Sequence, residues 1–412
     1  MTQSTSGGAV PLSKRFAALW RSLEPIGRDP ATGGYQRFTW TEAERACREW
    51  FVEEAHDRSL AVETDRCGNQ WAWWGDPHAG GAVATGSHLD SVPQGGAYDG
   101  PLGIVSALLA IDLLREQGVE PSRPIAVVAF AEEEGARFGV ACLGSRLLTG
   151  ALPAEQALAL HDADGVGLIE AMMAAGLDPG AIGADPERLQ RLSAFIELHI
   201  EQGRGLGEHP VGVASVIWPH GRWRMEFTGT PNHAGTTRMA DRQDPMLTLA
   251  YTVLAANKEA RLASAHATVG RVEVTPNATN AVPASARAWL DARAADQSTL
   301  DAMVAAIRVR AEERAGRDGT AFAMTAESFS PMTEFDVALR ERIVALLDGA
   351  PVLPTAAGHD AGILAAAGVP AAMLFVRNPT GVSHAPGEHA SDEDCAAGVQ
   401  ALARVLEDLA CQ

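Results

Sequence analysis

The stretch GAVATGSHLDSVPQGGAYDGPLG, residues 81–103, decides how this chain folds. Its first seven residues are apolar or small and predict a buried strand. A loop rich in glycine follows, and after it apolar residues recur at helical spacing at Ile104, Ala107, Leu108, Ile111 and Leu114. A strand, a tight loop and a helix in this order predict the repeating unit of an α/β fold.

The rest of the chain divides into three blocks. Residues 124–130 and 193–200 predict two more buried strands, so the first block has the texture of a mostly parallel central sheet with flanking helices. Residues 214–330 instead predict four strands and two helices, enough for a smaller α+β domain. The α/β texture then returns, so we expect one domain from 1–213 and 331–412 with an inserted domain at 214–330.

Charge and composition exclude several classes of function. The 412 residues carry 33 Lys and Arg against 52 Asp and Glu, a net charge of −19 that repels nucleic acid and anionic membrane surfaces. The sequence has neither a long apolar run nor the apolar core of a signal peptide at its start, so we expect a cytoplasmic protein with no membrane partner. The five cysteines are scattered, which favours reduced, structural thiols.

Polar residues that can carry chemistry follow the predicted strands. His88 and Asp90 lie two residues apart at a strand end, where Asp90 can support the imidazole from behind, and the glycine-rich loop can fold Asp99 towards them. The alternative is a polar loop with an incidental histidine.

Three consecutive glutamates, Glu132, Glu133 and Glu134, follow the buried strand at 124–130. Adjacent buried carboxylates repel one another unless a cation or a shared proton compensates, and one of them then has a raised pKa suited to moving protons. The alternative is a solvated acidic loop.

His199 and His384 each lie close to a strand end, and either one alone could be a structural histidine. Together with Asp99 and the glutamates they form the donor set of Zn²⁺ or a similar ion. The inserted block adds His233, a possible oxyanion donor, and Arg293, which matches a carboxylate. The alternative for Arg293 is an exposed strand charge.

Several motifs together resemble the M20 metallopeptidase-type amidohydrolases, in the branch that contains N-carbamoyl-L-amino-acid hydrolase, β-ureidopropionase and allantoate amidohydrolase. The resemblance covers nearly the whole chain. The motifs that carry it are GSHLDSVPQGGAYDG, EEEGARFG, ELHIEQG, NHAGTT, the segment from Asn280 to Arg293, AGHDA and the SHAP of His384.

The resemblance implies a zinc-peptidase-like catalytic domain with two divalent ions, Zn²⁺ or Mn²⁺, with Co²⁺ or Ni²⁺ also possible. One ion would be held by His88, Asp99 and His199, and the other by Asp99, Glu134 and His384, with Asp99 bridging. Glu133 would be the general base, although three glutamates in a row leave a shift of one residue open. Asp90 and His233 would complete the catalytic set.

The resemblance also implies a substrate site and an assembly. The substrate-binding residues would be Gln202, Asn280, Arg293, His359 and Arg377. The inserted domain would act as a lid and form a homodimer, in which His233 can come from the partner subunit. The sequence departs from its relatives at Arg238, and at Arg377 and Asn378.

The implied activity is hydrolysis of a C–N bond in a small substrate with a carboxylate, either allantoate or an N-carbamoyl-L-amino acid. His199 stands where related peptidases have a carboxylate, which favours this branch over the dipeptidases. The alternatives are an N-formyl or other N-acyl amino-acid hydrolase, for example of N-formylglutamate, a dipeptidase, or, in a different class, a non-catalytic binding module.

Overall fold

The computed structural model describes residues 10–411, which form two compact units. One unit consists of the chain before Val216 together with the chain after Thr333, and the other of Val216–Thr333. The boundaries expected from the sequence, 213/214 and 330/331, fall close to these positions.

The first unit is built on a nine-stranded sheet in the order β1-β2-β4-β3-β5-β15-β6-β13, with β14 paired to β6. Its four central strands are parallel neighbours: β4 (Ile125–Phe130), β3 (Ala82–His88), β5 (Leu192–Ile200) and β15 (Ala371–Val376). The outer strands are β1 (Ala61–Thr64), β2 (Gln70–Trp74), β6 (Val211–Ile217), β13 (Thr333–Glu334) and β14 (Val352–Thr355). The α/β class with a mostly parallel sheet is thereby confirmed, and the sheet also has antiparallel pairs outside its centre.

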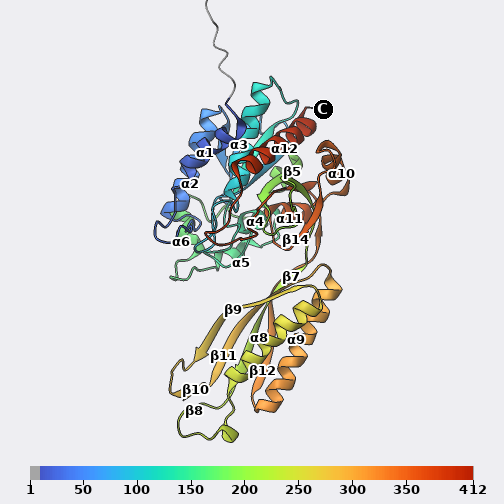
Figure 1. Ribbon diagram of the computed structural model, residues 1–412. Coiled ribbons are helices and arrows are strands. Elements are labelled where there is room, and N and C mark those ends of the chain that lie inside the picture. The colour runs from blue at the N-terminus through green and yellow to red at the C-terminus, as the bar shows by residue number, and fades with distance from the viewer. Residues whose placement is uncertain (1–9, 412) are drawn as a thin grey trace, which may run out of the picture. The chain divides into compact units, whose positions relative to one another are not determined.

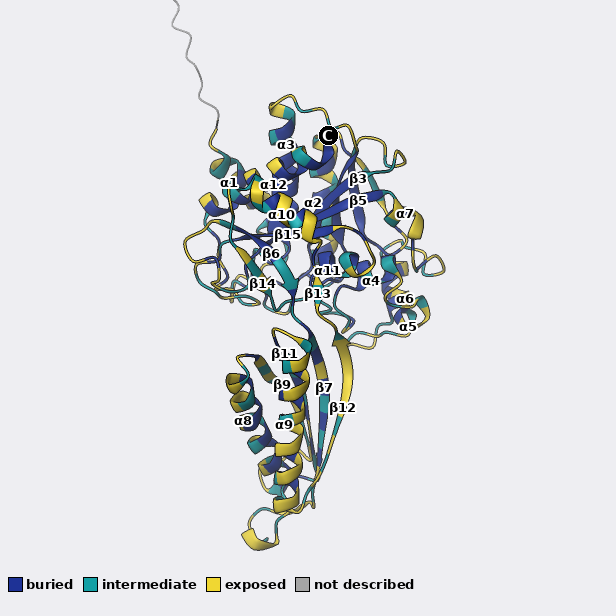
Figure 2. Ribbon diagram, turned by 90° about the vertical axis from the view of Figure 1, so that its right-hand side faces the viewer, coloured by how far each residue is buried: buried dark blue, intermediate teal, exposed yellow. Residues whose placement is uncertain are grey.

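The central strands are buried on both faces, which explains why they read as continuous apolar runs. Figure 2 shows β3 and β5 as buried along their length. Helices α1 (Leu12–Leu23), α3 (Pro101–Glu116) and α12 (Asp392–Ala410) pack against one another, and α4 (Leu143–Thr149) packs against α11 (Asp360–Ala366). The remaining helices of this unit are α2 (Glu42–Asp57), α5 (Ala154–Leu158), α6 (Leu168–Ala174), α7 (Pro186–Gln190) and α10 (Val337–Leu346).

Two glycines at the start of α3 allow an unusually close approach between backbone and neighbours. Gly100 has φ +88°, and a Cβ there would lie 2.5 Å from the imidazole of His88. Within the helix, a Cβ on Gly103 would lie 2.4 Å from the carbonyl oxygen of Leu198 in β5. The first turn of α3 therefore lies directly against the ends of β3 and β5.

The second unit has a four-stranded antiparallel sheet in the order β12-β7-β11-β9, covered by two helices. The strands are β7 (His220–Thr228), β9 (His266–Thr275), β11 (Ser285–Arg293) and β12 (Ala321–Ser330). The helices are α8 (Pro245–Leu262) and α9 (Gln297–Asp318), which lie side by side in both views (Figures 1 and 2). These are the four strands and two helices expected, and the structure adds a short ribbon of β8 (Asn232–His233) and β10 (Ala281–Val282), and a 3₁₀ turn, η1 (Met239–Asp241).

The structure also bears on the expectations about membrane-spanning helices and about the cysteines. In the described residues, no helix combines the length and apolarity that crossing a membrane requires. The five cysteines are free, and four of them are buried.

The close contact at Gly103 predicts an unusual effect of alanine in a helix. Alanine favours a helix by about 1 kcal/mol over glycine, but at position 103 the added methyl group would overlap Leu198. We expect Gly103→Ala to lower the free energy of unfolding by about 1–3 kcal/mol. Gly316→Ala, in α9 with no atom within 4 Å of the new Cβ, should instead stabilise or be neutral. Urea unfolding of both variants checks this, and equal effects would contradict it.

Candidate metal centre

The polar residues singled out in the sequence gather at the carboxyl ends of the central parallel strands. His88 ends β3, His199 lies at the end of β5, and the three glutamates follow β4. Asp99 lies just before α3, and His384 lies in the loop after β15. Because neighbouring parallel strands end at the same edge of the sheet, these side chains meet there.

Asp99 is the centre of this cluster. Its Oδ1 lies 3.1 Å from Nε2 of His199 and 3.5 Å from Nε2 of His88. Its Oδ2 lies 3.4 Å from Nε2 of His384, which is also 3.5 Å from Oε2 of Glu134. One carboxylate therefore faces two separate groups of ligand atoms with its two oxygens.

Hydrogen bonds on the far side of two imidazoles fix their orientation. Nδ1 of His199 lies 2.8 Å from the carbonyl oxygen of Ile200, and Nδ1 of His88 lies 3.1 Å from that of Asp90. Since a carbonyl oxygen can only accept, the proton of each neutral ring sits on Nδ1. Nε2 of each ring faces Asp99, and it is the atom that can bind a metal once it carries no proton.

Asp90 links the histidine to the glutamates. Its two carboxylate oxygens accept hydrogen bonds from the backbone N–H groups of Glu133, at 3.2 Å, and Glu134, at 3.1 Å. Oδ1 also lies 3.5 Å from Nδ1 of His88. Asp90 thus holds the ends of two strands together and lies behind His88, where the sequence analysis placed it.

The three glutamates have different surroundings. Oε1 of Glu132 accepts hydrogen bonds from the backbone N–H groups of Arg137, at 2.8 Å, and Phe138, at 2.7 Å, and so closes the turn that follows. Oε2 of Glu133 lies 3.7 Å from Nε2 of His88, and its Oε1 accepts from the thiol of Cys142. Glu134 faces His384.

Burial raises the free energy of the ionised form of each of these acids. Burial, followed by the charge of Asp99, raises the pKa of Glu134 to about 7, and burial raises the pKa of Glu133 well above its usual range. Burial also opposes ionisation of Asp99, but the charge of His199 and the closeness of the other two imidazoles hold its pKa well below the usual value. The hydrogen bond to Asp99 raises the pKa of His384 to about 9.

These residues fit divalent metal ions. Two groups of possible ligands, His88 with Asp99 and His199, and Asp99 with Glu134 and His384, each have ligand atoms within 4.8 Å of one another. Ligands about 2.1 Å from a tetrahedral ion lie roughly 3.4 Å apart, close to the observed separations of 3.1–3.5 Å. Within the described part of the chain, the buried Nε2 atoms of His88 and His199 have no hydrogen-bond partner, as expected of atoms reserved for a cation.

A third group of possible ligands, Glu197, His199 and His359, fits a metal less well. Both oxygens of Glu197 are engaged, by the hydroxyl of Ser87 at 2.9 Å and the backbone N–H of Ala361 at 2.9 Å. Burial, reinforced by the charge of His199, lowers the pKa of His359 well below its usual value, so this ring is neutral. His359 lies against the ring of His199, with centroids 4.6 Å apart.

Gln202 also contacts the centre, and its amide nitrogen donates to Oδ2 of Asp99 at 2.8 Å. Three further contacts of the cluster were not predicted from the sequence. Ser383 donates to the same oxygen at 3.2 Å, Cys142 donates to Glu133, and Glu388 binds the backbone of Asp99. For Ser383 and Glu388, the only indication in the sequence was that they lie within five residues of His384.

Three predicted residues, His233, Asn280 and Arg293, belong to the second unit. Nδ1 of His233 accepts the backbone N–H groups of Gly235 and Thr236, at 3.0 and 3.2 Å, so its proton sits on Nε2, which can donate to an oxyanion. Arg293 is half-buried at the end of β11 and binds both oxygens of Asp291. The carbonyl of Asn280 accepts the N–H of Ala234, which joins its loop to that of His233.

In the structure, the side chain of Arg377 is hydrogen-bonded to two acidic side chains of the protein. Its guanidinium donates to Asp394 at 3.0 Å and to Glu208 at 3.1 Å. Its substrate-binding role remains a prediction, and a substrate carboxylate would compete with these two acids. The adjacent Asn378 is buried, and its side chain accepts from Thr380 and donates to the carbonyl of Val382, which orders the loop leading to His384.

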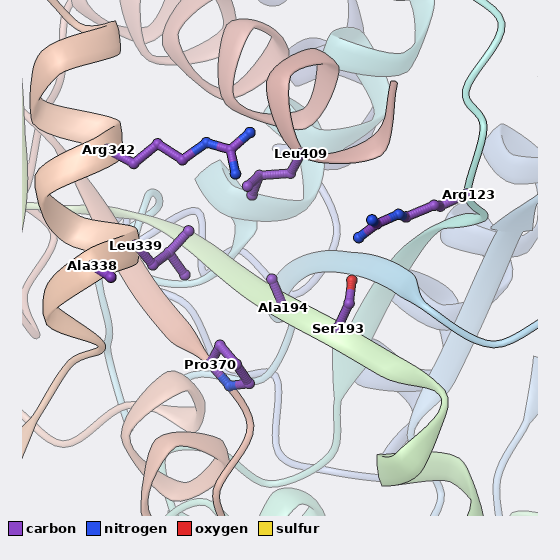
Figure 3. A pocket seen from close by; sticks show the side chains of 8 residues that line it. All are labelled: Arg123, Ser193, Ala194, Ala338, Leu339, Arg342, Pro370 and Leu409. Atoms are coloured by element: carbon purple, nitrogen blue, oxygen red, sulfur yellow. The ribbon is translucent and has the colours of Figure 1, made fainter. Parts of the chain in front are cut away.

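A cavity of about 270 Å³ lies elsewhere in the first unit, at the amino end of β5 (Figure 3). Its labelled lining residues include Arg123, Arg342 and Ser193, and none of the eight is a histidine or an acid. Arg342 donates to Asp408 at 2.6 Å. This cavity offers no ligands of the kind found around Asp99, so the candidate site is the cluster at the carboxyl ends.

Comparisons with known proteins agree with this geometry. The family model described as peptidase family M20/M25/M40 matches residues 84–408. The chain is 37% identical to an N-carbamoyl-L-amino acid amidohydrolase of Geobacillus stearothermophilus, over 95% of this chain and 98% of that one. It is 32% identical to an allantoate amidohydrolase of Escherichia coli, over 95% and 96%. A solved amidase of the hydantoinase/carbamoylase family from Burkholderia vietnamiensis superposes with a TM-score of 0.87 at 31% identity, over 97% of this chain and 98% of that one.

The raised pKa of His384 predicts how metal affinity depends on pH. Because the metal-free imidazole holds its proton below a pKa of about 9, a metal ion must displace that proton at neutral pH. The apparent affinity of the stripped protein for Zn²⁺ should therefore fall by at least about tenfold for each unit that the pH decreases from about 8 to 6, and more steeply below 7, where Glu134 also takes up a proton. Competition with a coloured chelator measures this. His161→Asn, which changes an exposed histidine outside the cluster, should keep the slope, and a flat profile in the unchanged protein would contradict the prediction.

Proposed function

Because the chain belongs to peptidase family M20/M25/M40, we propose that it is a metal-dependent amidohydrolase that cleaves a C–N bond of a ureido or N-carbamoyl amino acid. The observation that carries the proposal is the shared carboxylate of Asp99, whose two oxygens face two sets of ligands. The relatives named above act on N-carbamoyl-L-amino acids and on allantoate, so these are the two substrate types proposed.

In this proposal two divalent ions, Zn²⁺ or Mn²⁺, are held by five side chains, with Asp99 common to both sites. When bound, such ions polarise a carbonyl group and make water a stronger acid. The ligands would be His88, Asp99 and His199 at one site, and Asp99, Glu134 and His384 at the other.

Glu133 is the proposed general base. Its Oε1 is held by the thiol of Cys142, while Oε2 lies beside His88 and remains available to a water molecule. A carboxylate whose pKa is raised by burial both accepts a proton from water and returns it to a leaving nitrogen. For a carbamoyl substrate and one water, the products are the amino acid, ammonia and carbon dioxide.

Both units supply proposed contacts to the substrate. The Nε2–H of His233 would donate to the oxygen of the scissile carbonyl as charge develops there. Arg293, with Asn280, would bind the substrate carboxylate through its planar guanidinium. Gln202, whose buried Oε1 has no partner among residues 10–411, and His359 would contact the ureido end. We further propose that this unit is a lid and forms a homodimer, and that the enzyme acts in the cytoplasm.

The choice between base and ligand can be tested with two matched variants. Glu133→Gln should keep two ions per chain but lower kcat by about 10²–10⁴-fold, because only the proton transfer is lost. Glu134→Gln should instead lose one ion. Metal analysis alongside turnover measures both. Unchanged turnover in Glu133→Gln would remove this residue from the mechanism, and the reverse pattern would exchange the two roles.

A panel of substrates separates the proposal from its rivals. With Zn²⁺ or Mn²⁺, we expect N-carbamoyl-L-amino acids or allantoate to be hydrolysed at least about tenfold faster, by kcat/KM, than N-formylglutamate or dipeptides, because only the former carry a ureido end. Ammonia release and amine release report the two reactions. Faster cleavage of N-formylglutamate or of a dipeptide would contradict the proposed substrate class, and a protein that binds metal but cleaves none of these would be a binding module.

A further inference from the structure

Glu388 lies in the loop between β15 and α12, four residues after His384. Its side chain is directed away from solvent, and only 4% of the residue is exposed. Oε1 accepts two backbone hydrogen bonds, from the N–H of Tyr98 at 2.8 Å and from that of Asp99 at 2.9 Å. A carboxylate in the loop of one proposed metal ligand therefore binds the backbone of another.

A glycine makes room for this carboxylate. A Cβ on Gly96 would lie 2.3 Å from Oε1 and 2.4 Å from the carboxylate carbon of Glu388. Any side chain at position 96 would thus expel the carboxylate from its place beside Tyr98 and Asp99. The glycine-rich loop that precedes Asp99 is shaped around Glu388 as well as around the turn itself.

The backbone of Glu388 and the loop that carries it are also held in place. The backbone N–H of Glu388 donates to the carbonyl of Ala385 at 3.0 Å, which closes a turn directly after His384. The imidazole of His384 has half of its surface exposed, whereas those of His88 and His199 are buried in the sheet edge. His384 therefore depends on its loop for its position, and the loop is joined to Asp99 through Glu388.

We propose that Glu388 is a positioning residue that keeps His384 and Asp99 at the distance required by the second metal ion. This inference rests on the metal centre of the proposed function. Two charge-assisted hydrogen bonds from backbone N–H groups hold a buried carboxylate firmly, and the partners of metal ligands commonly change affinity by 10–100-fold when they are removed. Glu388 does not contact the substrate or the reacting atoms in this account.

The role is geometric, so an uncharged acceptor of the same shape should replace it. In Glu388→Gln the amide oxygen can accept both N–H groups, and its nitrogen takes the place of Oε2, which has no hydrogen-bond partner in the described chain. In Glu388→Ala the acceptor of both hydrogen bonds is lost. The pair therefore separates position from charge.

The test is a calorimetric titration of the metal-stripped full chain with Co²⁺, followed by kcat and KM of the loaded enzyme. We expect two ions in the unchanged protein, and in Glu388→Ala one site weakened by about 10–100-fold with a lower kcat and little change in KM. Glu388→Gln should stay within about threefold of the unchanged protein. Gly96→Ala should reproduce the loss at one site, because its methyl group displaces the carboxylate.

A matched control distinguishes positioning from general loss of stability. Asp185 is another buried acid that accepts a backbone N–H, from Arg188 at 3.2 Å, and it caps α7 outside the cluster. Asp185→Ala should lower Tm while both Co²⁺ affinities stay unchanged.

Two results would overturn the inference: Co²⁺ affinities in Glu388→Ala equal to those of the unchanged protein, or a loss in Glu388→Gln as large as in Glu388→Ala. If Glu388→Ala does not fold, the glutamine and Gly96 variants decide the question. Failure of the proposed function looks different, because then the unchanged protein itself binds no Co²⁺ or hydrolyses no carbamoyl substrate.

Discussion

The repulsion between acidic side chains buried at one edge of the sheet is the constraint on which the site depends. Asp90, Asp99, Glu133 and Glu134 lie within one cluster, and the groups that face them include backbone N–H groups and imidazoles but neither a lysine nor an arginine among the contacts described above. Asp90 accepts hydrogen bonds from two backbone N–H groups of the protein. For the other three acids, divalent ions placed among them and the imidazoles would offset the cost of burying their charge.

The fold supplies that arrangement through close backbone contacts. Gly100 lets the chain pass over the ring of His88, Gly103 seats α3 against β5, and Gly96 leaves space for Glu388. Each glycine serves a different neighbour, and all three lie in the short segment between the end of β3 and the first turn of α3. Precision at the site therefore comes from the rigid edge of the sheet together with this one loop, which is the arrangement expected for a pre-organised centre.

The central strands and most residues of the cluster were predictable from the sequence. Continuous apolar runs identified β3, β4 and β5 within one or two residues, because strands buried on both faces are made mostly of apolar residues. The family resemblance supplied the proposed ligand set, and the structure brings His88, Asp99, Glu134, His199 and His384 together in groups that could hold a metal ion. The antiparallel strands β1 and β2 were missed because Gln70–Trp74 is short and rich in tryptophan, and its pairing depends on a partner distant in sequence.

Contacts that join distant loops could not be predicted in this way. No pattern of spacing indicates that Glu388 binds the N–H of Asp99, or that Cys142 donates to Glu133, since each contact exists only after the strands have brought the loops together. The different surroundings of the three glutamates likewise depend on the turn at Glu132, which has φ +55°. The central claim is that Asp99 bridges two ions. An anomalous difference map from crystals grown with Zn²⁺ tests it most directly: two peaks on either side of the Asp99 carboxylate are expected, and a single peak, or none beside Asp99, would contradict it.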